Sequence, residues 1–211
     1  MKKHLFVSLF FALSLIFTGC ASSYNSINPK TFAYSNNLTE SNVDFSYRFA
    51  ILRAKGNKKY AKKEERTGIK VIAVKITNNS GGDLILGENF NIFSGIRPLI
   101  PMEPAATYRH LKQGVAIYLL YLPLTVLRLN VYNNSSSGRN VRSYPIGYAL
   151  GPGITIGNMI EASTSNKSLK TDLIVFDLAN KKIANGETVY ALISSENVGT
   201  TPLTLQLKGA E

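Results

Sequence analysis

The sequence predicts a mainly β protein, an antiparallel β-sandwich interrupted by an apolar helical hairpin. Three observations favour this fold class. Short alternating or β-branched stretches lie towards both ends of the chain, turns rich in Asn and Gly separate them, and two long uncharged stretches lie between. The chain has 211 residues, of which 45% are hydrophobic and 18% are charged, so it is long enough for one folded domain.

The first twenty residues have the order of a secretory signal peptide. Lys2 and Lys3 precede an apolar run at 5–17, and small residues follow it. Thirteen helical residues span about 20 Å, which is less than the roughly 30 Å hydrocarbon core of a bilayer. We therefore predict a cleaved leader at 1–19 rather than a permanent transmembrane anchor.

The tetrad Phe17-Thr18-Gly19-Cys20 resembles the lipobox of bacterial lipoproteins, in which the cysteine becomes the acylated first residue of the mature chain. Cys20 is the only cysteine, and its thiolate would be the nucleophile that accepts the diacylglycerol. The resemblance implies a lipid-anchored protein of the cell envelope. Ala21 and Ser22 do not resemble the aspartate signal for inner-membrane retention, so we expect the outer membrane, with the leaflet and facing left open.

Residues 20–41 are expected to form a flexible tether. They are rich in Ser, Asn and Thr and contain Pro29, a composition that does not favour regular structure. The sandwich domain would then occupy 42–211, interrupted by an insertion at 98–168.

Several stretches of the domain have the pattern of short strands. Alternation at 43–51 predicts a half-buried strand, and a β-branched run at 69–76 predicts a second strand with Ile72, Val74 and Ile76 on one face. Further strands are predicted within the following stretches: 84–93, 169–178, 189–194 and 203–207.

Two segments resemble small immunoglobulin-like domains of bacterial envelope lipoproteins. They are Val74-Lys75-Ile76-Thr77-Asn78-Asn79-Ser80, which ends an early strand in an Asn-rich turn, and Ile183-Ala184-Asn185-Gly186-Glu187-Thr188-Val189, which opens the penultimate strand. The resemblance implies an immunoglobulin-like sandwich and brings no catalytic residues with it.

Seven basic residues and only two acidic residues lie between Arg53 and Arg66. This cluster suggests contact with an anionic envelope polymer or lipid through Lys58, Lys59, Lys62 and Lys63. An exported protein seldom meets nucleic acid, so no nucleic-acid partner is expected. The alternative is a solvated loop between two strands.

The insertion at 98–168 contains two uncharged stretches, 114–127 and 144–160. Such stretches must be buried by protein or by lipid. They either pack on the sandwich or contact the membrane or a partner protein, and the candidate contact residues are Tyr118, Leu119, Tyr121, Leu122 and Arg128. The pairs Gly147/Gly151 and Gly153/Gly157 have a spacing that permits close contact between helices.

The residues that carry most enzyme chemistry are sparse. The only histidine after the leader is His110, and no spacing predicts a metal site, a catalytic group or a cofactor. We therefore expect a non-enzymatic binding or scaffold module held at the membrane by acyl chains, with an envelope protein as a further partner. The alternative is an enzyme acting on glycan or lipid through dispersed carboxylates such as Glu88, Glu103 and Glu161.

Overall fold

The computed structural model describes residues 20–34, 36–40, 42–135, 138–179, 181–199 and 201–208. The predicted leader at 1–19 lies outside these residues. The chain divides into two compact units, which are treated separately below. The first unit comprises 1–23 and 113–164, and the second comprises 24–112 and 165–211.

The fold is mixed α/β, and the prediction of an immunoglobulin-like β-sandwich is wrong. In the described part of the chain the strands are divided among four small antiparallel sheets of four, three, two and two strands. Long helical segments contribute as much to the structure as the strands do. The predicted insertion at 98–168 contains α4, η2, the β7–β8 hairpin and most of α5, whose bounds are given below.

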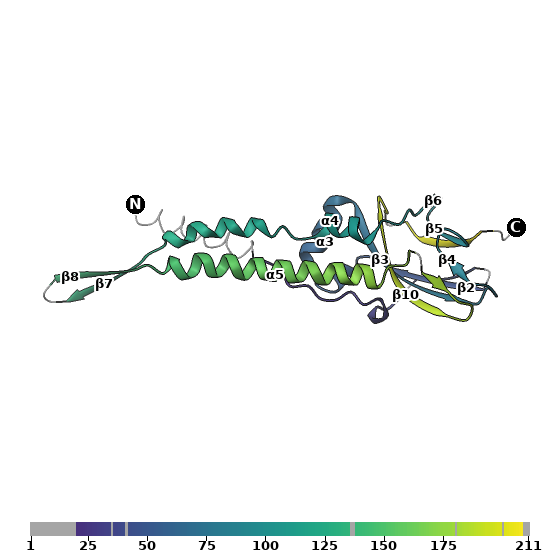
Figure 1. Cartoon of the computed structure of the whole chain (residues 1–211), viewed down its shortest axis with the longest axis horizontal. Helices are drawn as coiled ribbons and strands as arrows, with labels where there is room; N and C mark the ends of the chain where they lie inside the picture. Colours follow the sequence, from purple (N-terminus) through teal and green to yellow (C-terminus); the bar gives the residue numbers. More distant parts are fainter. Residues whose placement is uncertain are drawn as a thin grey trace. The chain divides into compact units, whose positions relative to one another are not determined.

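The second unit is built on a four-stranded sheet in the order β1-β2-β3-β10 (Figure 1). Its strands are β1 (Asn36–Glu40), β2 (Val43–Arg48), β3 (Ile69–Asn78) and β10 (Thr188–Glu196), and each neighbouring pair is antiparallel. Val43, Phe45 and Tyr47 enter one hydrophobic core with the alternating isoleucines and valine of β3. The alternation in the sequence therefore identified the inner face of β2 correctly.

Three-stranded and two-stranded sheets complete this first core. One has the order β11-β5-β6 and contains β11 (Leu203–Leu207), β5 (Phe90–Ser94) and β6 (Arg97–Pro98). The other pairs β4 (Leu84–Ile85) with β9 (Lys182–Ile183). The strands predicted within 84–93 and at 203–207 are confirmed, and they contribute Phe90, Ile92, Leu203 and Leu205 to the core.

Strand β3 is buried on both of its faces, and this explains why the sandwich prediction fails. Val71 and Ala73 point into a second hydrophobic core that is separate from the one containing Ile72 and Val74. Helices supply most of the rest of this second core: α2 (Ile51–Ala54), α3 (Lys58–Thr67), α4 (Pro104–Leu111) and the last part of α5 (Gly147–Val175). Ile27 and Leu192 of β10 complete it. An apolar run without strict alternation is typical of a strand covered on both sides.

The basic stretch forms helix α3 rather than a solvated loop. Tyr60, Ala61 and Glu64 share its buried side at helical spacing, and Gly68 ends it with a φ of 73°. Glu64 accepts a 2.7 Å hydrogen bond from the Val71 N–H, and burial raises its pKa to about 7. The many charged residues on the exposed side of this helix obscured the helical spacing of its buried residues in the sequence.

The predicted strand at 169–178 is also a helix, because α5 continues to Val175. Leu169 and Leu173 are one helical turn apart, and both are buried in the second core. The local alternation of Leu, Ile, Val and Phe had favoured a strand.

Residues 24–34 differ from the expected flexible tether, because they are held against the second unit. Ile27 is fully buried, and the Asp172 carboxylate accepts 2.9 Å hydrogen bonds from the Tyr24 hydroxyl, the Ser26 hydroxyl and the Ile27 N–H. Burial raises the pKa of Tyr24, and the Asp172 charge raises it further. The short helix η1 (Pro29–Thr31) follows.

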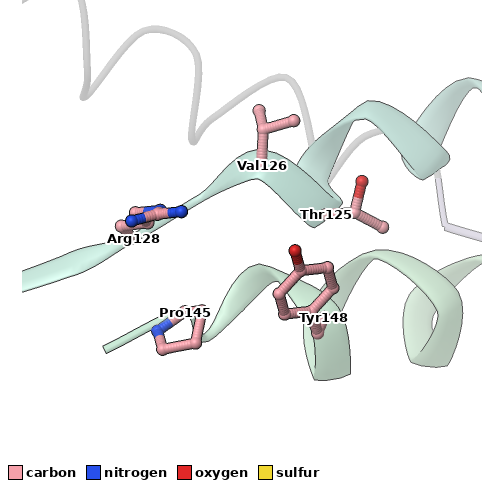
Figure 2. A pocket seen from close by; sticks show the side chains of 5 residues that line it. All are labelled: Thr125, Val126, Arg128, Pro145 and Tyr148. Atoms are coloured by element: carbon pink, nitrogen blue, oxygen red, sulfur yellow. The ribbon is translucent and has the colours of Figure 1, made fainter. Parts of the chain in front are cut away.

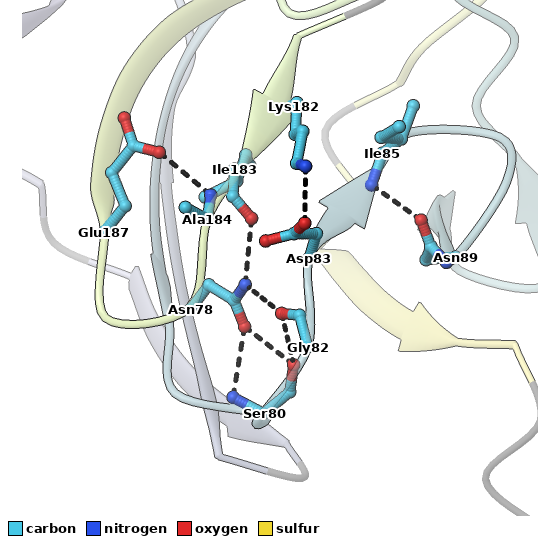
Figure 3. A network of polar contacts seen from close by, with 10 residues as sticks. All are labelled: Asn78, Ser80, Gly82, Asp83, Ile85, Asn89, Lys182, Ile183, Ala184 and Glu187. Atoms are coloured by element: carbon cyan, nitrogen blue, oxygen red, sulfur yellow. Dashed lines mark hydrogen bonds and ion pairs between the residues drawn. The ribbon is translucent and has the colours of Figure 1, made fainter.

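The turn after β3 is joined to the turn before β10 by the buried Asn78 side chain (Figure 3). Its Nδ2 donates to the carbonyls of Gly82 at 2.7 Å and Ile183 at 3.0 Å. Its Oδ1 accepts from the Ser80 N–H at 3.0 Å and the Ser80 hydroxyl at 2.7 Å. An ion pair of 2.6 Å between Lys182 and Asp83 lies beside this network. Two segments about a hundred residues apart in the sequence are thereby linked.

We predict that Asn78→Ala destabilises the second unit by about 2 to 3 kcal/mol, because buried carbonyl and N–H groups lose their partners. Urea unfolding followed by the fluorescence of buried tyrosines measures this loss. Asn79→Ala is the matched control, since Asn79 is exposed and its side chain makes no hydrogen bond with the described residues. Equal stability of the two variants would contradict the role given to Asn78.

Candidate functional site

The first unit contains an unusually long 3-10 helix, a β-hairpin and the first part of α5. The helix is η2 (Ala116–Val126), and the hairpin consists of β7 (Leu129–Ser135) and β8 (Gly138–Tyr144) (Figure 1). The prediction of a plain helical hairpin is therefore wrong. The residues between the two uncharged stretches form antiparallel strands paired from Leu129–Tyr144 to Ser135–Gly138.

The end of η2 packs directly on the backbone of α5 at two glycines. A Cβ atom at Gly147 would overlap the carbonyl oxygens of Leu124 and Thr125. A Cβ atom at Gly151 would lie 2.6 Å from Thr125 Cγ2 and 2.8 Å from Thr125 N. The pair Gly147/Gly151 thus marks a close contact, as such spacing does in helix pairs elsewhere, whereas a Cβ atom at Gly153 or Gly157 would meet nothing within 4 Å.

The backbone that follows Cys20 is fixed to the same unit. The Ala21 N–H donates to Asn158 Oδ1 on α5. The Ser22 N–H donates to Gln113 Oε1 at 3.2 Å, and Gln113 Nε2 donates back to the Ser22 carbonyl at 2.7 Å. Gln113 Oε1 also accepts a 3.4 Å hydrogen bond from the buried Tyr118 hydroxyl. No pattern in the sequence indicates the roles of Gln113 and Asn158.

Cys20 is exposed and lies beside two tyrosines of η2. Burial raises the pKa of Tyr118, and the charges of Tyr121 and Cys20 add to the rise. Burial and the charge of Cys20 also raise the pKa of Tyr121. The two rings are nearly parallel, with centroids 6.4 Å apart. The predicted lipidation residue and two of the predicted contact residues therefore lie together.

Most of the exposed large apolar side chains belong to this unit. Leu119 is 47% exposed and Leu122 is 42% exposed, whereas Tyr118 is buried. Packing into a protein core, the alternative for this stretch, therefore accounts for Tyr118 alone among these three. Of the twenty exposed large hydrophobic residues in the described chain, sixteen lie in the first unit: Ile117, Leu119, Leu120, Leu122, Val126, Leu127, Leu129, Val131, Tyr132, Val141, Tyr144, Ile146, Tyr148, Leu150, Ile156 and Ile160.

The first part of α5 has small and polar residues on its buried side and large apolar residues on its exposed side. Gly147, Gly151 and Thr155 are buried at intervals of four residues. Ile156 and Ile160 are 56% and 61% exposed. This distribution is the reverse of that in a helix of a water-soluble protein, and small residues at helix contacts are typical of proteins surrounded by lipid.

The four lysines predicted to contact an anionic surface do not form one open face. Lys58 and Lys62 are exposed on α3, whereas Lys59 and Lys63 are half-buried. The Lys63 ammonium donates to the Lys112 carbonyl. Burial lowers the pKa of Lys63, and the charges of Arg66 and Lys112 lower it further. Of the four lysines, only Lys58 and Lys62 are exposed enough to contact an extended polymer.

The carboxylates of the enzyme hypothesis lie on different elements of the described chain. Glu88 and Glu103 are exposed in the second unit, before β5 and α4, and Glu161 is half-buried on α5 in the first unit. Among the described residues, no group of three His, Cys, Asp or Glu side chains could hold a metal ion.

Comparisons of the chain with protein-family models, with curated proteins and with solved structures find no match. Within the residues that the structure describes, no helix combines the length and the apolar character needed to cross a bilayer.

We predict that Gly151→Ala loosens η2, because overpacking against Thr125 costs about 1 to 3 kcal/mol. Amide hydrogen exchange in η2 should become faster. The control is Gly153→Ala in the same helix, where the added Cβ meets open space and higher helix propensity contributes up to about 1 kcal/mol of stability. If helix propensity alone governed both sites, the two variants would slow exchange equally.

Proposed function

We propose that this protein is a non-enzymatic lipoprotein of the cell envelope, anchored by acyl chains on Cys20, whose first unit lies against the lipid of the membrane. The observation that carries the proposal is the position of Cys20. Its exposed side chain lies beside Tyr118 and Tyr121, in the unit that carries most of the exposed apolar surface.

Acyl chains attached to Cys20 would begin next to η2. Ala21 and Ser22 are held to Asn158 and Gln113, so a bilayer that receives the chains also meets the adjacent apolar side chains. Each buried CH₂ of an acyl chain contributes about 0.8 kcal/mol, and stable attachment usually combines two membrane-binding signals. The exposed surface of η2 supplies the second signal.

Lipid is a better cover for this surface than water or a protein core. An exposed apolar area of this extent is abnormal for a soluble monomer. Eleven residues of 3-10 helix span about 22 Å, which suits entry into one leaflet. Tyr121 and Arg128 are residue types that favour the level of the lipid headgroups.

The second unit would serve as the scaffold or binding body in the aqueous phase. It contains both hydrophobic cores described above and the exposed Lys58 and Lys62 of α3. An anionic envelope polymer or an envelope protein is the partner that we propose for it, at the outer membrane.

The enzyme hypothesis has less support. Glu64 and Asp177 are the described carboxyl groups whose pKa is raised, in each case mainly by burial. Neither lines the cavity near Arg128 or the cavity between the β5–β6 turn and residues 195–201. A raised carboxyl pKa indicates a catalytic acid or base only where the group also lines a cleft that a substrate can enter.

The anchor is tested by expressing the full chain in a bacterium that processes lipoproteins. Mass spectrometry of the N-terminal peptide should show a mature chain that begins at Cys20 and carries acyl groups, because the thiolate is the acceptor. Cys20→Ser should lose the acyl mass entirely, whereas Ser23→Ala, a change at an exposed neighbour, should retain it. An intact leader or an unmodified Cys20 in the wild-type chain would exclude the anchor.

The membrane surface is tested separately on a chain that begins at residue 20 and carries Cys20→Ser, so that no acyl group contributes. We expect it to float with vesicles of phosphatidylethanolamine and phosphatidylglycerol. The double variant Leu120→Asp, Val126→Asp should bind these vesicles at least about tenfold more weakly, because each change removes an apolar contact and adds a charge.

The matched control is Ile96→Asp, Ile100→Asp in the second unit. Ile96 and Ile100 are 95% and 75% exposed, and Leu120 and Val126 are 75% and 78% exposed, so neither pair disturbs a core. Equal binding by both double variants would contradict lipid contact. Self-association without vesicles, lost only in the Leu120→Asp, Val126→Asp variant, would indicate a protein partner for the surface instead.

A further inference from the structure

A cavity of about 360 Å³ lies where η2 ends and α5 begins (Figure 2). Thr125, Val126 and Arg128 line it on one side, and Pro145 and Tyr148 line it on the other. Figure 2 shows the Tyr148 hydroxyl directed towards the η2 side. The volume is at the lower end of the range for small-molecule sites.

Three hydrogen-bond donors at this cavity have no partner among the described residues. They are the Arg128 guanidinium, the Thr125 hydroxyl and the Tyr148 hydroxyl. A guanidinium presents a planar fork that matches two oxygens of a phosphate, and hydroxyl groups donate to the remaining oxygens.

Within the described part of the first unit, no carboxylate of the hairpin or of the first turns of α5 competes for this cation. The only acidic residue between 113 and 164 is Glu161, which is thirteen residues beyond Tyr148 on the same helix, or about 20 Å along its axis. The cavity therefore has one positive charge that no nearby side chain neutralises.

We propose that this cavity binds the phosphate of an anionic membrane lipid. The proposal rests on the lipid contact proposed above and names the headgroup chemistry for it. Arg128 pairs with the phosphate, and the Tyr148 hydroxyl donates to another of its oxygens.

The walls of the cavity favour a lipid over a free anion. Val126 and Tyr148 are 78% and 70% exposed, and Val126 is the last residue of η2, which also carries the exposed Leu119, Leu120 and Leu122. A ligand whose phosphate meets Arg128 can therefore lay its acyl chains on that helix. Pro145 and the ring of Tyr148 give the cavity an apolar floor.

The test uses the full chain purified in a non-ionic detergent and native mass spectrometry to count bound lipid. Three probes are titrated: phosphatidylglycerol, diacylglycerol with the same acyl chains, and glycerol 3-phosphate. We expect phosphatidylglycerol to bind most tightly, because it alone has both the phosphate and the chains. Arg128→Ala should weaken its binding about tenfold or more, and Tyr148→Phe about threefold.

The matched control is Arg142→Ala, since Arg142 is an exposed arginine on β8 that does not line the cavity. Arg128→Lys should recover only part of the affinity, because an ammonium lacks the fork. Circular dichroism should show that each variant is folded. Equal losses in the Arg128 and Arg142 variants, or equal binding of diacylglycerol, would overturn the phosphate site.

The two proposals fail in different ways. If glycerol 3-phosphate bound as tightly as phosphatidylglycerol, the cavity would be a site for a free phosphate compound and the lipid assignment would be wrong. If the Arg128 variants bound phosphatidylglycerol normally while the Leu120→Asp, Val126→Asp variant still lost vesicle binding, the cavity proposal alone would fail.

Discussion

The close contact between η2 and α5 is the constraint on which the first unit depends. Gly147 and Gly151 allow the two backbones to meet, so the side of α5 that carries small residues is covered by η2. The large apolar side chains then have no place between the helices and lie on the outside, as Leu120 and Ile160 do. In water this arrangement is unfavourable, whereas next to lipid tails it costs nothing. The packing of the glycines therefore determines which side chains of the unit are exposed.

In the second unit, by contrast, most of the large apolar side chains are buried in two cores. Its sheet places Phe45 and Ile76 in one core and Ala73 in another, with polar groups such as Asn78 buried only where they have hydrogen-bond partners. A chain with both patterns has one part suited to water and one suited to an apolar surface. The Cys20 thiol lies in the second of these parts.

The sequence predicted local elements well where one face of a strand met one core. The alternation of Val43, Phe45 and Tyr47 and the run at 203–207 correspond to β2 and β11. The prediction failed where helices cover a second face of a strand. Helices cover the far face of β3, and the charges of α3 concealed the buried Tyr60, so a mixed fold was interpreted as a sandwich.

For the candidate site, the sequence identified Cys20 and the apolar stretch but not how they meet. Gln113 and Asn158 lie about 90 and 137 residues from their partners, and no local pattern reports hydrogen bonds over such separations. The cavity at Arg128 is formed by residues from the two ends of a hairpin, 125–128 and 145–148, and hence depends on the pairing of β7 with β8. Tertiary contacts of this kind are set by the whole fold and not by neighbours in the chain.

The hydrogen bond from Ala21 to Asn158 has a consequence for how far the protein can act from its attachment point. A free linker of 22 residues would extend about 75 Å, whereas a single residue between the acylated sulfur and the first fixed N–H extends about 4 Å. Without a flexible linker, an anchored first unit would thus be confined to the bilayer surface. If the proposed anchor is present, a ligand of this unit would have to reach it at the membrane surface.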